Sequence, residues 1–238
     1  MNSDADRHVQ VIGIGAGDPA WLTLEAVRAL EALDVAFVFQ KGADDELAAA
    51  RRALLPDGVR EVVIEDPPRG RGVEAVAAWR AERVRLVRDA VAASDGNAGF
   101  LAWGDPTLYD GLIGVLREAG FRVRVVPGIS AVSALAARFG VALNRVAGAV
   151  LITTGRRLEA GWPSDADDVV VMLDAGLAFR AYPDAEIFWG AYLGTPDEIL
   201  LSGVVAEVGG EIERVRSAAR LRKGWMFDTY LLRRASPA

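Results

Sequence analysis

The sequence has no cysteine and only one histidine, His8. The missing cysteine excludes a disulfide framework, a thiol nucleophile and a thiolate metal site, and it is compatible with a reducing compartment. His8 lies in a polar N-terminal segment with no second ligand at helical spacing, so we expect it to be solvated and to bind no metal. If the chain is an enzyme, its chemistry does not use a thiol nucleophile.

Long apolar runs and a basic excess are missing too. The first apolar run, residues 9–14, contains a glycine and falls far short of the ~20 residues that cross a bilayer. We therefore expect no secretory signal and no membrane span, and a cytoplasmic protein. The 27 basic residues are outnumbered by 33 acids, which gives a net charge of −6 and no general attraction to nucleic acid or an anionic membrane. An anionic ligand would need a local basic patch.

The chain does contain enough apolar material for a packed core, with 238 residues, 52% hydrophobic side chains and a mean hydropathy of +0.20. Up to residue 126, short strands alternate with helical segments. This pattern predicts an α/β domain over residues 1–126, with a mainly parallel sheet and crossover helices. The predicted strands cover residues 9–14, 35–39, 62–64, 100–103 and 123–126.

Two helices of this part have clear signals. Thr23 is predicted to cap a helix that turns Val27, Leu30 and Leu33 toward the core. A longer helix is predicted to bury one valine face: Val76, Val84, Val87 and Val91. Its opposite face is predicted to be solvated, with anion binding as the less favoured interpretation, and carries Arg80, Arg83, Arg85 and Arg88.

The alternation of strands and helices ends at Pro127 and Gly128, where we expect the boundary between two domains. Apolar runs then follow one another with less helix between them. This predicts a second, α+β domain with a mixed sheet over residues 127–238, and a cleft between the two domains. The runs cover residues 149–152, 169–173, 186–193, 199–206 and 225–232.

Residues 13–19 (GIGAGDP) form the strongest local motif, at the end of the first predicted strand. Three glycines let a ligand approach the main chain closely. A dinucleotide fingerprint would place its third glycine where Asp18 stands and an acid at the end of the next strand, which ends in Gln40 and Lys41. No Gly-Lys-Ser/Thr follows, so the Walker pattern is absent. A nicotinamide or flavin site is the less favoured alternative.

Two further turns follow predicted strands. Residues 103–109 (WGDPTLY) stand at the carboxyl end of the fourth strand, the side on which open α/β sheets bind ligands. Asp105 and Pro106 are equally typical of an ordinary turn that starts a helix. Residues 127–131 (PGISA) form the third turn, in which Ser130 can cap a helix, hydrogen-bond a ligand, or do both.

These motifs, followed by residues 153–157 (TTGRR), Met172 in a buried strand, 193–196 (LGTP) and 223–230 (KGWMFDTY), resemble the tetrapyrrole methylase family over nearly the whole chain. Three longer blocks are most similar to the branch that methylates C1 of precorrin-5 in aerobic cobalamin synthesis and releases its acetyl group: residues 150–157, 189–198 and 223–232. The resemblance implies two α/β domains that hold folded S-adenosylmethionine between them, a tetrapyrrole substrate and a homodimer.

The resemblance also implies which residues contact the cofactor. Ala16 stands where many relatives have a proline, a departure that removes a rigid contact but leaves the glycine turn. The implied cofactor-binding residues are Gly15, Ala16, Gly17, Trp103, Gly104, Asp105, Leu108, Ser130, Ala131, Met172, Gly194, Thr195, Trp225 and Met226.

A tetrapyrrole with many carboxylates needs guanidinium partners, which bind carboxylates bidentately. Arg156 and Arg157 are the first candidates, ahead of Arg69, Arg71 and Arg145, and helix caps or surface pairs are the alternative role for each. Loss of the acetyl group also needs a polar group that handles a proton. The candidates for this catalytic role are Asp105 and Tyr109, and also Asp228.

Other functions stay open at this point. A methyltransferase of the same fold could act on another precorrin, on uroporphyrinogen, or on a macromolecule such as ribosomal RNA or a modified histidine, although the acidic balance counts against RNA. Outside this fold's chemistry, the alternatives are a nucleotide-binding oxidoreductase and a non-catalytic binding domain.

Overall fold

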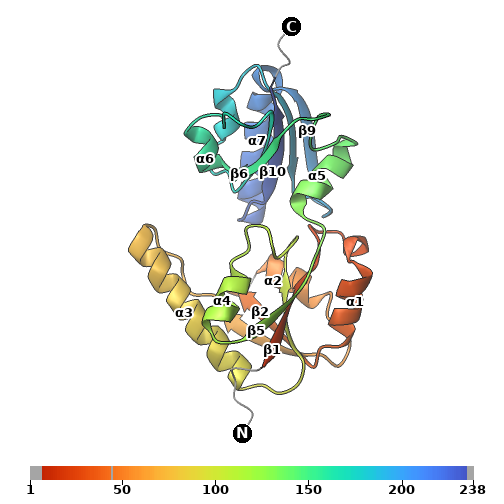
Figure 1. The fold of residues 1–238 in the computed structure, drawn as a ribbon, viewed down its shortest axis with the longest axis vertical. Coiled ribbons are helices and arrows are strands. Elements are labelled where there is room, and N and C mark those ends of the chain that lie inside the picture. The colour runs from red at the N-terminus through yellow and green to blue at the C-terminus, as the bar shows by residue number, and fades with distance from the viewer. Residues whose placement is uncertain (1–6, 44, 235–238) are drawn as a thin grey trace. The chain divides into compact units, whose positions relative to one another are not determined.

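The computed structural model describes residues 7–43 and 45–234, and the chain divides into two compact units (Figure 1). Unit 1 consists of the residues up to Gly15 together with Pro19–Ile129. Unit 2 consists of Ala16–Asp18 and the residues from Ser130 onward. Three residues of the glycine turn therefore belong to unit 2 by their contacts, although unit 1 precedes and follows them in the chain.

Unit 1 is built on a five-stranded sheet in the order β3-β2-β4-β1-β5, and all neighbouring strands run parallel. The predicted parallel sheet is confirmed, with strand ends that differ by one or two residues from those expected. The strands are β1 (His8–Gly13), β2 (Val35–Gln40), β3 (Arg60–Glu65), β4 (Ala98–Ala102) and β5 (Arg122–Val126).

Helices cover both faces of this sheet. On one face, Ile12 and Leu101 form a buried cluster with α1. Val11 and Phe100, one residue earlier on the same strands, belong to the opposite cluster with α3 and α4, because successive strand residues point to opposite faces. The helices are α1 (Leu24–Glu31), α2 (Glu46–Arg52), α3 (Val73–Ala92) and α4 (Leu112–Glu118), and the short 3-10 helix η2 (Pro19–Trp21) precedes α1.

The predicted start of α1 is confirmed: the Thr23 hydroxyl oxygen accepts a hydrogen bond from the Ala26 amide at 3.0 Å. Leu30 and Leu33 are buried as expected, whereas Val27 is only half-buried.

The arginine face of α3 is only partly as predicted. Arg80 and Arg85 pair with acids at the surface. Arg83, expected in solvent, is only 15% exposed and pairs with Asp66 at 3.0 Å. Its position explains the error, because Arg83 stands four residues before the buried Val87 and so lies beside the apolar stripe of the helix.

Unit 2 has a mixed sheet in the order β6-β7-β10-β8-β9, in which β6 and β7 are parallel and the other pairs antiparallel. This confirms the predicted mixed sheet. The strands are β6 (Val150–Thr154), β7 (Asp168–Met172), β8 (Glu186–Ala191), β9 (Ile199–Val204) and β10 (Asp228–Arg233). The helices are α5 (Ala131–Phe139), α6 (Gly155–Glu159), η3 (Ala178–Ala181) and α7 (Val205–Lys223).

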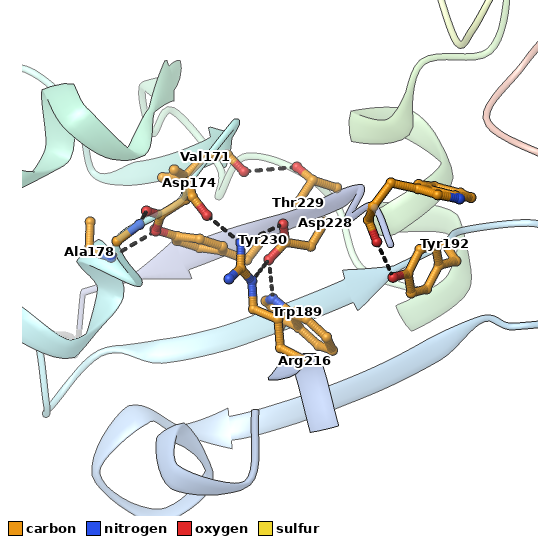
Figure 2. A network of polar contacts seen from close by, with 11 residues as sticks. Val171, Asp174, Ala178, Trp189, Tyr192, Arg216, Asp228, Thr229 and Tyr230 are labelled. Carbon is orange, nitrogen blue, oxygen red and sulfur yellow. Dashed lines mark hydrogen bonds and ion pairs between the residues drawn. The ribbon is translucent and has the colours of Figure 1, made fainter. Parts of the chain in front are cut away.

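A buried polar network ties the elements of unit 2 together (Figure 2). Asp174 is 4% exposed and accepts hydrogen bonds from the Tyr230 hydroxyl at 2.6 Å and the Ala178 amide at 2.7 Å. Asp228 accepts from Arg216 at 2.8 Å and from the indole nitrogen of Trp189 at 3.1 Å. Arg216 also donates to the Asp174 carbonyl at 2.6 Å, so η3, α7, β8 and β10 are fixed to one another.

His8 is the first residue of β1 and is exposed, which corrects its expected place in a polar tail. Within residues 7–43 and 45–234, no group of three or more metal-ligating side chains could hold a metal ion. Over the same residues, no helix is both long and apolar enough to span a membrane.

Candidate ligand site at the glycine bends

Three glycine bends of unit 1 lie directly against one another. Gly15 and Gly104 form a two-residue bridge with N–O distances of 3.2 and 2.8 Å. A Cβ atom on Gly13 would lie 2.6 Å from the Gly128 nitrogen, and one on Gly128 would lie 2.2 Å from the Gly104 oxygen. No side chain larger than hydrogen fits at these two positions, so glycine allows the main chains of the bends to pack directly against one another.

The bends stand where the topology of the sheet favours ligand binding. β1 and β4 are neighbours and parallel, so their carboxyl ends, Gly13 and Ala102, meet at one edge. From there the chain leaves β1 toward α1, on one face of the sheet, and leaves β4 toward α4, on the other face. Open α/β sheets bind ligands at such a switch point.

Asp105 holds two of the bends together. Its Oδ1 accepts a hydrogen bond from the Thr107 amide at 2.7 Å, and its Oδ2 accepts one from the Gly128 amide at 3.1 Å. Both carboxylate oxygens are therefore engaged by main chain. Trp103 and Leu108 flank Asp105 and are half-buried.

Tyr109 closes this loop in a strained conformation. Its φ of 55° is in the left-handed region, which costs an L-residue about 1–2 kcal/mol. The side chain is 46% exposed. Its partial burial raises the pKa of the hydroxyl, which therefore stays protonated at neutral pH.

Ser130 follows the third bend and caps α5, because its hydroxyl oxygen accepts a hydrogen bond from the Ser133 amide at 3.2 Å. The predicted capping role is thus confirmed. Ala131 is the first residue of the helix.

The other implied cofactor residues gather at one edge of the unit 2 sheet. The strand register places Met172 beside Thr154 and Thr229, and Asp228 beside Ala191. The chain then continues from β8 into residues 192–195 and enters β10 from residues 225–227. Gly194 and Thr195 lie in the first of these segments, and Trp225 and Met226 lie in the second.

Tyr192 joins these two segments. Its hydroxyl donates to the Trp225 carbonyl at 2.7 Å, and the two rings pack edge to face at 4.9 Å. Thr195 donates its hydroxyl to the Tyr192 carbonyl at 2.7 Å. The glycine turn packs here as well: a Cβ on Gly17 would lie 2.4 Å from the Leu193 oxygen. Ala16, beside it, is 4% exposed.

The predicted substrate arginines fall into three groups. Arg156 and Arg157 are exposed at the start of α6, after the β6 end that adjoins Met172, and within the described part of the chain neither makes a hydrogen bond or ion pair. Arg71 is exposed and equally unpaired among those residues, whereas Arg69 lies 5.1 Å from the Trp79 ring. Arg145 pairs with the fully buried Asp168 at 3.0 Å, so its charge already neutralises a carboxylate of unit 2.

Several groups at these edges carry no local sequence signal. Tyr192 and Asp174 were not singled out, although a Cβ on Gly155, the residue before Arg156, would lie 2.2 Å from Asp174. Arg51 and Trp79, near the strand ends of unit 1, were also missed. Each takes its place through contacts with residues far away in the sequence.

Comparisons with known proteins agree with this arrangement. Over residues 8–209 the chain matches the family Tetrapyrrole (Corrin/Porphyrin) Methylases. It is 41% identical to a Precorrin-6A synthase [deacetylating] of Sinorhizobium sp, over 97% of this chain and 96% of that protein.

Solved structures have the same fold. A cobalamin-synthesis-related protein, CobF, of Corynebacterium diphtheriae is 34% identical, with a TM-score of 0.80 over 95% of this chain and 98% of that one. A uroporphyrin-III C-methyltransferase of Thermus thermophilus, complexed with S-adenosylhomocysteine, is 21% identical, with a TM-score of 0.62 over 94% and 91% of the two chains.

Unit 1 has a parallel sheet with main-chain bends at its switch point, and unit 2, joined to it in sequence, has a mixed sheet. These features define a two-unit α/β protein with a ligand-binding type of topology. The family match is more specific. The chain belongs to the tetrapyrrole methylase family.

Proposed function

We propose that the protein is an S-adenosylmethionine-dependent methyltransferase of cobalamin biosynthesis, which methylates C1 of precorrin-5 and releases acetate to give precorrin-6A. The similarity to the Sinorhizobium enzyme over nearly the full length of both chains carries this proposal. The three glycine bends that meet in unit 1 support it, because they lie at the switch point of the parallel sheet, where open α/β sheets bind ligands.

The residues at the bends fit the proposed cofactor. We propose Gly15, Gly104 and Asp105 as cofactor-binding residues, and the family resemblance also implies Met172 and Thr195. Once bound, S-adenosylmethionine supplies a methyl group attached to a sulfonium. The chain needs no strong nucleophile for this transfer, because an electron-rich ring carbon of the tetrapyrrole provides the attacking electron pair.

Positioning is then the main contribution of the protein to methyl transfer. Holding two reactants in line can lower a barrier by about 7–11 kcal/mol through the entropy already lost on binding. We assign Asp105 to this role, because its two oxygens fix the bends around Gly104 and Gly128. Arg156 and Arg157 are proposed to bind substrate carboxylates, and Arg69 and Arg71 to assist them.

Acetate release requires a water oxygen to add to the acetyl carbonyl and the bond from that carbonyl to the ring to break, with the bonding electrons returning to the macrocycle. A proton must leave the water during this step. That proton passes to solvent water. We propose that Tyr109 donates a hydrogen bond to the acetyl carbonyl oxygen, which becomes negative as water adds, since its hydroxyl is protonated, partly exposed and held by a strained backbone beside Asp105. Arg145 is left out of the proposed substrate set because Asp168 already neutralises its charge.

Mass spectrometry of precorrin-5 incubated with the protein and S-adenosylmethionine tests the reaction. The expected product has gained one methyl group and lost its acetyl group, with one acetate released for each methyl transferred. Methyl gain without acetate would reject the deacetylating reaction and leave a methyltransferase. Calorimetry with S-adenosylhomocysteine and NADH is the companion test, and binding of NADH alone would favour an oxidoreductase.

We further propose that the enzyme is a cytoplasmic homodimer, as the family resemblance implies. Light scattering behind a sizing column should give twice the chain mass of 25.4 kDa. A mass equal to one chain at micromolar concentration would contradict the dimer.

A further inference from the structure

Arg51 stands in the last turn of α2 and reaches the carboxyl end of β4. Its Nε donates a hydrogen bond to the Leu101 carbonyl at 3.1 Å, two residues before Trp103. Most of its side chain is buried. Its two terminal nitrogens have no hydrogen bond and no ion pair with any residue in the described ranges of the chain. The guanidinium is thus anchored through one nitrogen and open at its other end.

Nearby acids do not take up this charge directly. Burial lowers the pKa of the Arg51 guanidinium, and the carboxylates of Asp45 and Asp110 offset part of that effect. Asp45 already accepts hydrogen bonds from Leu47 and Ala48 at the start of α2, and Asp110 accepts one from the Leu112 amide at 2.7 Å. The terminal nitrogens of Arg51 are not among the fully buried polar atoms that lack a partner, so solvent reaches the open end and an anion there could accept charge-assisted hydrogen bonds.

Two neighbouring arginines have guanidinium groups that are paired with acids. Arg83 pairs with Asp66 at 3.0 Å and lies over the Phe39 ring at 4.0 Å. Arg52, next to Arg51 in the helix, hydrogen-bonds Glu61 and Gln40. Of these three side chains, only Arg51 has no acid within ion-pair distance among residues 7–43 and 45–234.

We propose that Arg51 binds a side-chain carboxylate of the tetrapyrrole and so helps to set specificity for a polycarboxylate macrocycle; this rests on the proposed function. The planar guanidinium offers its two terminal nitrogens to a carboxylate as a fork. Arg156 and Arg157, the foremost substrate candidates, belong to unit 2. A ring with carboxylates around its edge needs several cations, and Arg51 supplies one at the carboxyl end of β4.

The test compares R51Q with R52Q, a matched control from the same helical turn whose arginine is already paired. Binding of uroporphyrin, a stable porphyrin with a carboxylate on every side chain, is followed by fluorescence, and binding of S-adenosylhomocysteine by calorimetry. R51Q should weaken uroporphyrin binding about 10- to 100-fold, because a charged hydrogen-bonding partner is lost. R52Q should bind the porphyrin as the wild type does, and both variants should bind S-adenosylhomocysteine normally.

Each other outcome overturns the proposal. If R51Q weakens S-adenosylhomocysteine rather than the porphyrin, Arg51 serves the cofactor. If both affinities match the wild type, Arg51 only anchors β4. If the wild type binds neither compound, the proposed function fails and the assignment of Arg51 fails with it. Should R51Q not fold, R51K keeps the charge without the fork, and its porphyrin affinity must then fall several-fold.

Discussion

Replacing Gly128 by alanine is the most direct test of the site at the glycine bends. The new methyl carbon would lie 2.2 Å from the Gly104 oxygen and 2.8 and 2.9 Å from main-chain carbons of Gly13. All three atoms belong to the main chain, so no flexible side chain can move aside. Overpacking of this kind costs about 1–3 kcal/mol, and we expect the upper end of that range here.

A loss of about 3 kcal/mol corresponds to a fall in Tm of about 10 °C for a unit of this size. The bends must also separate, so the Kd for S-adenosylhomocysteine should rise at least about tenfold. Urea unfolding and calorimetry measure the two effects. Gly210→Ala is the control, since that exposed helical glycine has nothing within 4 Å of a new Cβ and should gain about 0.5–1 kcal/mol.

The reasoning would be refuted by a Gly128→Ala protein with wild-type unfolding midpoint and wild-type cofactor affinity. That result would mean that the bends do not contact one another in solution as described. A loss of affinity without loss of stability would instead show that the bends can separate at little cost.

Three further predictions concern other groups. Asp105→Ala removes two acceptors of main-chain hydrogen bonds and should raise the Kd for S-adenosylhomocysteine about tenfold; unchanged calorimetry would contradict its positioning role. Arg156→Ala should raise the KM for the tetrapyrrole and leave kcat nearly unchanged. A lower kcat at constant KM would contradict its proposed role in binding substrate carboxylates. Tyr230→Phe should cost about 1.5–3 kcal/mol in urea unfolding, because the hydroxyl donates to the buried Asp174 carboxylate. Burial and Asp174 raise the pKa of Tyr230, so in the wild type stability should fall above about pH 10, where only the unfolded tyrosine ionises, and this fall should be weaker in Tyr230→Phe.

The local signals that predicted the elements were strong ones. Strands β1 and β7 are rich in β-branched apolar residues, Val9, Val11 and Ile12 in the first and residues 169–171 in the second, and Thr23 supplied the side chain that caps α1. Periodicity does not contain the strand order of either sheet, because that order depends on contacts between distant segments. The turns could therefore be recognised, while their mutual contacts through Gly13, Gly104 and Gly128 required the structure.

Charged residues were harder to interpret for a related reason. A sequence shows that Arg145 and Arg83 are cations, but it does not show that Asp168 and Asp66 lie beside them. Arg51 carries no local sequence signal, because the acceptor of its hydrogen bond is a main-chain carbonyl fifty positions away. Burial of a charge depends on the tertiary fold, so its role could not be read from composition or spacing.

Because Gly17 packs against Leu193 and Thr195, one continuous segment of the gene that starts at residue 130 does not encode all of unit 2. A fragment that begins at Ser130 would carry both strands that flank this contact but would lack the short N-terminal segment that fills it. Unit 2 is therefore discontinuous in the gene, and a single cut, a fusion partner or an exchange between homologues at residue 130 would leave it incomplete.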